Sequence, residues 1–218
     1  MNPAHHLRTV MDDAEFYNKL AHFPYLTVLI SIPEEFSRRI ERIQNRLKRI
    51  DDRQLYHHPS NLHITVKLIG FLGKDVRGEY LPRIRDKVEK VAAGTSPFSA
   101  TLRGLGVFPD AIYADVQEGK ENIRKLHVEI RRELRRYSVT SRYEGENMHP
   151  HMTIATILAA GNAERLIQEV GRSERTEIGR MRVDKIKLVR VIPHEVSEEK
   201  RASLLEDVAS FPLGFARG

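Results

Sequence analysis

Two segments of this sequence share one pattern: a histidine, an apolar residue, a threonine and an apolar residue. They are His63–Val66, called here the first motif, and His151–Ile154, the second motif, which begins 88 positions later. In an extended strand, alternate side chains point to opposite faces, so each motif would present an imidazole and a hydroxyl together. Histidine titrates near neutral pH and is suited to general acid–base work. The two motifs predict a site made of two matched halves.

The elements around the motifs recur in the same order. Each motif is the third member of a strand–helix–strand–helix–strand series, as judged from apolar spacing. In the first series the flanking segments are 25–30, 36–50, 81–91 and 98–107. In the second they are 112–116, 123–137, 166–170 and 181–192. This order predicts an internal duplication, with little side-chain identity between the copies.

At these residues the chain resembles the 2H phosphoesterase superfamily, and within it the RNA 2′,3′-cyclic phosphodiesterases also known as 2′-5′ RNA ligases. The pair of histidine–x–threonine motifs carries most of the likeness. Three smaller features agree with it: Gly70 after the first motif, Gly106–Pro109 between the motifs, and Pro150 directly before the second histidine. The resemblance covers the chain from about Tyr25 onward.

The resemblance implies an α+β, bilobal fold. Two mainly antiparallel sheets would face a central cleft with helices outside, related by an internal pseudo-twofold repeat. Residues 1–24 are expected to form an N-terminal extension and 25–218 a single bilobal domain, with repeat halves of about 25–108 and 109–192. The terminal segments of the chain would share one lobe, and its middle would form the other.

Two segments are ambiguous by spacing alone. Residues 202–212 have helix-like apolar spacing, whereas the resemblance implies a final strand, which we adopt as the prediction. Residues 181–192 read as one strand whose apolar phase changes, and a bulge would explain the change.

The activity implied is hydrolysis of a 2′,3′-cyclic phosphate at an RNA end to a 2′-phosphate, together with 2′-5′ RNA ligation, in which a 5′-hydroxyl opens the cyclic phosphate. Water attack needs a base and the departing sugar oxygen needs an acid, so two imidazoles on opposite sides of phosphorus fit in-line displacement. The resemblance assigns His151 as base and His63 as acid. The hydroxyls of Thr65 and Thr153 would bind the phosphate oxygens. The strained cyclic diester does not oblige a metal, so no metal and no cofactor are expected.

Three further residues are predicted to meet the substrate. Lys67 has the parity of His63 and Thr65, so it should share their face and bind phosphate, whereas Ala155 takes this position after the second motif. Arg142 and Tyr143 lie in a polar segment just before the second motif and could meet a phosphate and a base.

Composition sets limits on the remaining possibilities. The 218 residues carry a formal net charge of +6, which favours an anionic partner such as RNA. No cysteine is present, so disulfides and thiolate chemistry are excluded. No apolar run approaches a membrane span, and the N-terminus has no apolar core of a secretion signal. We expect a soluble, cytoplasmic monomer that does not bind membranes.

Alternatives remain at this point. Within the enzyme class, the substrate could instead be a small nucleotide or an ADP-ribose cyclic phosphate. A non-catalytic RNA-binding module would also fit the basic charge. Five histidines near the motifs could suggest zinc, but no HExxH pattern occurs, and His149 and His151 are expected to share a strand face without a nearby carboxylate ligand. These residues are His57, His58, His63, His149 and His151.

Overall fold

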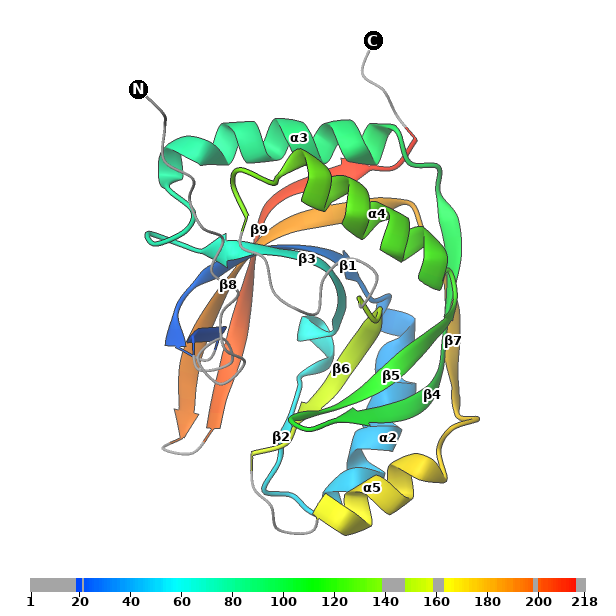
Figure 1. Ribbon diagram of the computed structural model, residues 1–218. Helices are drawn as coiled ribbons and strands as arrows, with labels where there is room; N and C mark the ends of the chain where they lie inside the picture. Colours follow the sequence, from blue (N-terminus) through cyan, green and yellow to red (C-terminus); the bar gives the residue numbers. More distant parts are fainter. Residues whose placement is uncertain (1–18, 21, 139–147, 159–162, 198–199, 215–218) are drawn as a thin grey trace.

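The computed structural model describes residues 19–20, 22–138, 148–158, 163–197 and 200–214. Most of the expected N-terminal extension lies outside this part. The strands are β1 (Tyr25–Ser31), β2 (Leu55–Tyr56), β3 (His63–Phe71), β4 (Phe98–Phe108), β5 (Ala111–Glu118), β6 (His151–Thr156), β7 (Glu177–Val183), β8 (Lys185–Ser197) and β9 (Lys200–Pro212). The helices are α2 (Ser37–Lys48), α3 (Leu81–Ala93), α4 (Lys120–Glu133) and α5 (Ala163–Gly171). Helices and strands follow the predicted order as far as β7 (Figure 1).

All strand pairs of the described residues are antiparallel and belong to one nine-stranded sheet, in the order β7-β4-β5-β6-β3-β1-β8-β9, with β2 on β6. The register pair Ile64–Met152 joins β3 to β6. The two expected sheets are therefore two halves of one curled sheet, which join where the motif strands β3 and β6 pair. We call β3, β1, β8 and β9 with their helices the terminal lobe, and β6, β5, β4 and β7 with theirs the central lobe.

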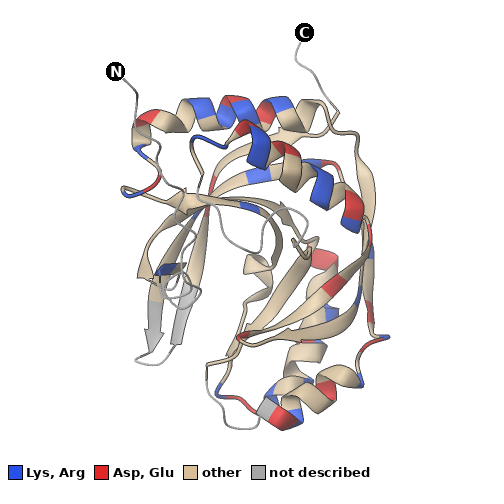
Figure 2. Ribbon diagram, in the orientation of Figure 1, with Lys and Arg blue, Asp and Glu red and all other residues tan. Residues whose placement is uncertain are grey.

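The helices cover the outer face of each half. α3 and α4 pack together over β3, β8 and β9, whereas α5 lies on β4 and α2 on β6 (Figure 1). On α4, for example, Ile123, Leu126 and Ile130 form a buried stripe at helical spacing. Lys and Arg recur along α3 and α4, interspersed with Asp and Glu (Figure 2). No helix in the described part is long and apolar enough to cross a membrane.

Repeat halves and lobes do not coincide, because the halves exchange elements. Helix α2, from the first half, covers β6, and α4, from the second, covers β3. Likewise β4 pairs with β5, and β8 pairs with β1. The strands follow the predicted arrangement, in which the chain's middle forms one lobe and its terminal segments the other, whereas helices α2 and α4 each cover the opposite lobe.

The two ambiguous segments resolve differently. The C-terminal segment is strand β9, as predicted. The run 181–192 is not one bulged strand: β7 ends at Val183 and β8 begins at Lys185. β7 pairs with β4 in the central lobe, and β8 pairs with β1 in the terminal lobe. The change of apolar phase therefore marks a passage between lobes, and the bulge interpretation was wrong.

Candidate active site

The two motifs begin neighbouring strands, the first at the start of β3 and the second at the start of β6. The strands run antiparallel, with Ile64 opposite Met152 and both fully buried. Residues flanking such a pair point together to the other face, so each motif histidine stands beside the other motif's threonine. Both histidines and Thr153 are half-buried, and Thr65 is exposed. Two imidazoles and two hydroxyls thus gather where the lobes join.

Backbone carbonyls fix the tautomer of both imidazoles. Nδ1 of His63 lies 2.7 Å from the carbonyl oxygen of Asn61, and Nδ1 of His151 lies 2.6 Å from that of His149. A carbonyl can only accept a hydrogen bond, so each Nδ1 must carry the proton. Each Nε2 is then the atom that can take or give a proton during reaction.

Burial dominates the electrostatics of the pair. It lowers the pKa of His63, while the hydrogen bond to the Asn61 carbonyl acts in the opposite direction. It also lowers the pKa of His151, and the nearby imidazoles of His149 and His63 lower it further. The carboxylate of Asp115 has the smaller, opposite effect on His151. Lower pKa values favour neutral imidazoles at neutral pH, ready to accept a proton.

A β-bulge follows the threonine in both motifs. Thr65 pairs with Leu29 and Lys67 with Val28, so Val66 is the extra residue in β3. Thr153 pairs with Tyr113 and Ala155 with Ile112, so Ile154 is the extra residue in β6. Bulges re-aim side chains locally and recur beside active sites.

Each bulge carbonyl is held by a buried polar side chain from the helix behind it. Nδ1 of His127, on α4, donates to the Val66 carbonyl at 2.8 Å. Nε2 of Gln44, on α2, donates to the Ile154 carbonyl at 3.0 Å. We call His127 and Gln44 the bulge braces. The sequence reasoning missed both, although a polar residue within the apolar stripe of a helix was a signal for them.

The bulge overturns the prediction for Lys67. Its partner Val28 and the partner of Thr65, Leu29, are successive residues of β1 and point to opposite faces. Lys67 therefore lies on the other face from Thr65. It is 1% exposed, and its ammonium group donates to the Leu68 carbonyl at 2.6 Å. Strict alternation fails here because Val66 adds a residue, so the predicted shared face was wrong and we do not retain Lys67 as a phosphate ligand. Arg142 and Tyr143 lie outside the described residues.

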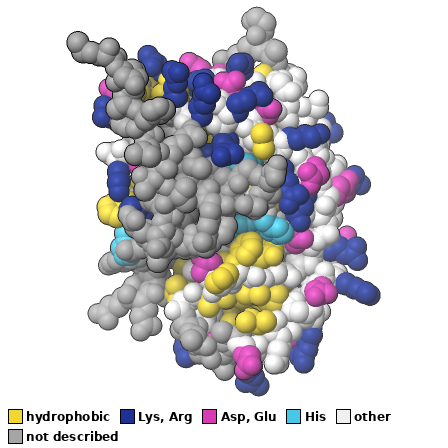
Figure 3. Space-filling model, in the orientation of Figure 1, with side chains coloured by type: hydrophobic (Ala, Val, Ile, Leu, Met, Phe, Trp, Pro, Cys, Tyr) yellow, Lys and Arg dark blue, Asp and Glu magenta, His cyan; other side chains and the backbone are white. Residues whose placement is uncertain are grey.

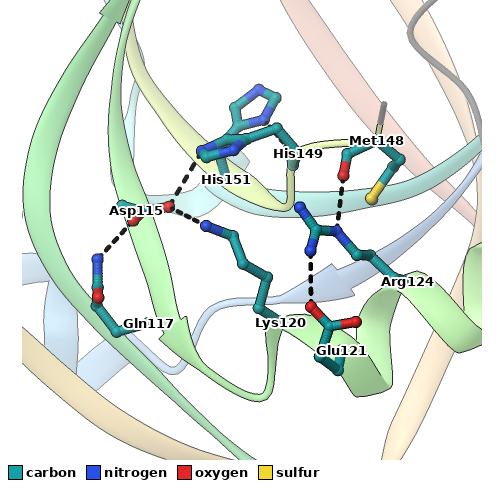
Figure 4. A network of polar contacts seen from close by, with 8 residues as sticks. All are labelled: Asp115, Gln117, Lys120, Glu121, Arg124, Met148, His149 and His151. Atoms are coloured by element: carbon teal, nitrogen blue, oxygen red, sulfur yellow. Dashed lines mark hydrogen bonds and ion pairs between the residues drawn. The ribbon is translucent and has the colours of Figure 1, made fainter. Parts of the chain in front are cut away.

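Aromatic and acidic groups surround His151. Its ring stands edge-on to Phe108 at 5.0 Å and to Tyr113 at 5.3 Å between centroids. Asp115 is the register partner of His151 on β5. An oxygen of its carboxylate lies 3.1 Å from Nε2 of His149 and 3.4 Å from the ammonium of Lys120 (Figure 4). None of Tyr113, Asp115 or Lys120 was predicted from the sequence.

His63 faces different surroundings. It borders a groove of about 510 Å³, whose polar lining includes Ser31, Ser60, His58, Lys187 and Asp207. We call this the polar groove. Its lining includes neither Phe108 nor Tyr113, the aromatic residues beside His151.

A third histidine, His57, lies near His63 and is held by a contact of 3.0 Å between its Nε2 and the hydroxyl oxygen of Thr156. Burial lowers the pKa of His57 to about 4, with a further contribution from His63. Within the described residues, no three His, Asp or Glu side chains are placed so that they could hold a metal ion.

Comparison with known proteins identifies the family. Residues 32–194 match the family model described as the 2′-5′ RNA ligase superfamily. The chain is 31% identical over 163 residues to an RNA 2′,3′-cyclic phosphodiesterase of Methanothermobacter thermautotrophicus, covering 74% of this chain and 86% of that protein. A protein of the same name from Aeropyrum pernix is 29% identical over 134 residues, covering 59% of this chain and 71% of that one.

Solved structures show the same fold. The crystal structure of TT0787 of Thermus thermophilus has a TM-score of 0.65 at 21% identity, covering 87% of this chain and 98% of that one. The structure of E. coli LigT complexed with 3′-AMP has a TM-score of 0.63 at 16% identity, covering 88% and 99%. With the paired motifs on one face of β3 and β6, these matches lead to one conclusion: the chain belongs to the 2′-5′ RNA ligase superfamily.

Proposed function

We propose that this protein hydrolyses the 2′,3′-cyclic phosphate at the end of an RNA to a 2′-phosphate, without a metal ion, and that 2′-5′ ligation is the same ring opening with an RNA 5′-hydroxyl in place of water. One observation carries the proposal: both motif histidines present Nε2 on the same sheet face, each beside a threonine hydroxyl. The relatives' name, RNA 2′,3′-cyclic phosphodiesterase, supports this choice of substrate.

The reaction follows from the two imidazoles. Nε2 of His151 takes a proton from water as its oxygen attacks phosphorus. The bound phosphate anion favours the imidazolium of His63 against the effect of burial, and Nε2 of this protonated His63 gives a proton to O3′ as the P–O3′ bond breaks. Thr65 and Thr153 donate to the non-bridging oxygens as charge builds on them. His151 suits the base role because the Asp115 carboxylate favours the imidazolium that forms there. In ligation, an RNA 5′-hydroxyl takes the place of water as the nucleophile.

The test is incubation of an RNA ending in 2′,3′-cyclic phosphate with the protein in EDTA, followed by phosphorus NMR of the product. A 2′-phosphate is the expected result. A 3′-phosphate, or turnover that requires added divalent metal, would contradict the proposal. His194→Ala, at an exposed histidine of β8, is the matched control and should remain active.

The same preparation separates the alternatives. Turnover of cyclic mononucleotides or ADP-ribose cyclic phosphate with no turnover of the RNA would transfer the activity to small nucleotides. Tight RNA binding with no turnover of any cyclic phosphate would identify a binding module instead.

A further inference from the structure

Two aromatic side chains that the mechanism does not use lie beside His151. The rings of Phe108, at the end of β4, and Tyr113, on β5, are stacked with centroids 4.3 Å apart and planes inclined by 24°. We call this pair the aromatic shelf. Both side chains are half-buried. Figure 3 shows apolar side chains gathered next to the histidines on this face of the molecule.

The shelf is not part of the apolar core. The core side of β5 consists of Ile112, Ala114 and Val116, which are fully buried. Tyr113 alternates with them and pairs with Thr153, on the motif face. Neither Phe108 nor Tyr113 belongs to the apolar clusters of the described residues. Two large aromatic groups thus remain partly open to solvent beside the reacting groups, where packing does not require them.

A glycine makes room for the Tyr113 ring of the shelf. Gly106 is the register partner of Tyr113, and a Cβ atom at Gly106 would overlap the Tyr113 ring. The ring can therefore lie across the backbone of β4. Phe108, two residues further along β4, stands on the same face and stacks on it. Sequence and register together produce a stacked pair of aromatic rings on the motif face.

We propose that the aromatic shelf binds the nucleobase of the nucleotide whose cyclic phosphate lies between His63 and His151, an inference that rests on the proposed function. Bases stack on aromatic side chains in single-stranded RNA recognition, and every base offers a π-face. The edge-on approach of His151 to both rings puts base and phosphate sites side by side. Recognition by stacking is tolerant of base identity, so the shelf selects for the presence of a base.

The shelf also orients the substrate. The base is attached to C1′, next to C2′, so a base held on the His151 side directs O3′ away from the shelf, toward His63. Water then approaches from the His151 side, opposite O3′. This orientation agrees with His151 as base and His63 as acid.

The experiment compares two RNA oligonucleotides that both end in 2′,3′-cyclic phosphate, one with a normal terminal nucleotide and one with an abasic terminal ribose. The quantity measured is the ratio of their kcat/KM values. Stacking is worth about 1–3 kcal/mol per base, so Phe108→Leu and Tyr113→Leu should each reduce the ratio by roughly 5- to 150-fold. Gly106→Ala, which displaces the Tyr113 ring without removing it, should reduce the ratio in the same direction. Tyr80→Leu, in the aromatic pair Tyr80–Tyr137 of the terminal lobe, is the control and should keep the wild-type ratio.

Each outcome decides the matter. An unchanged ratio in all three shelf variants, including equal losses on both oligonucleotides, overturns the base subsite while leaving the proposed function intact. A wild-type protein that opens neither oligonucleotide overturns the proposed function and the subsite with it. Thermal unfolding of each variant shows that the comparison is made on folded protein.

Discussion

The features that position His63 and His151 are alike, whereas the groups that line the site around the two imidazoles differ. Each motif has the same three features: an Nδ1–H bond from the histidine to the carbonyl two residues earlier, a bulge after the threonine, and a buried brace from a helix. Within the site, however, His63 borders the polar groove, whereas His151 lies beside the aromatic shelf and Asp115. The repeated features place the reacting groups, and the unrepeated ones can distinguish the two ends of a substrate.

The braces show what the duplication preserves. His127 and Gln44 differ chemically and come from helices of different halves, yet each donates to the carbonyl of a bulge residue. A bulge disrupts the ladder locally, and a buried carbonyl needs a partner. Backbone geometry has been kept where side-chain identity has not.

The largest expected effect comes from removing either histidine. His63→Ala and His151→Ala should each lower the rate of cyclic-phosphate opening by about 100-fold or more, as loss of a general acid or base does. Stopped-flow or gel assays of RNA cyclic-phosphate opening measure this. Near-normal turnover in either variant, with the fold intact by circular dichroism, would remove that histidine from the mechanism.

Removal of the hydroxyls should have the next largest effect. Thr65→Val and Thr153→Val keep the side-chain shape and lose the donors, so transition-state stabilisation should fall by about 2–4 kcal/mol, as for an oxyanion donor. The readout is kcat for RNA cyclic-phosphate opening. Wild-type kcat in both variants would show that the threonine hydroxyls do not act in catalysis and that these residues only favour strand structure.

A substrate with a good leaving group sharpens the comparison between the histidines. A nitrophenyl phosphodiester needs little help from an acid, so His63→Ala should lose much less activity on it than on RNA. His151→Ala should stay severely impaired, because water must still be activated. The ratio of rate losses on the two substrates is the measurement, and the reverse pattern would exchange the two roles.

From the sequence alone, the features that follow from local periodicity could be predicted, whereas those that depend on which strands pair could not. The motif strands, the recurring element order and Phe108 within Gly106–Pro109 were visible in the sequence. The position of Lys67 was not, because a bulge is defined by register with a partner strand. Tyr113 and Asp115 looked like ordinary alternating residues of β5, and only the neighbouring β6 makes them part of the site.

The braces allow a smaller test of stability. Gln44→Leu and His127→Leu remove donors from buried carbonyls, so each should lower the free energy of unfolding by about 1–3 kcal/mol. Urea denaturation measures this directly. Asn45→Ala, at a neighbouring residue on α2, is the control and should change stability little. The Ile154 carbonyl also accepts from the backbone N–H of His57 at 3.0 Å, so His127→Leu, at the Val66 carbonyl, is the stricter test. A brace variant that matches the control would show that its bulge carbonyl does not need the brace.

The smallest expected effect comes from removing the charge of the Asp115 carboxylate, the register partner of His151. The Asp115 carboxylate favours the imidazolium of His151, so it raises that pKa against the larger, opposing effect of burial. Asp115→Asn should therefore lower the pKa of His151. Because a base works only when deprotonated, the acidic limb of the kcat/KM profile should move to lower pH. Glu118→Gln, on the same strand but paired with Arg180, is the matched control and should leave the limb in place. A limb that moves to higher pH, or that both variants leave unchanged, would show that it does not report the His151 base beside Asp115.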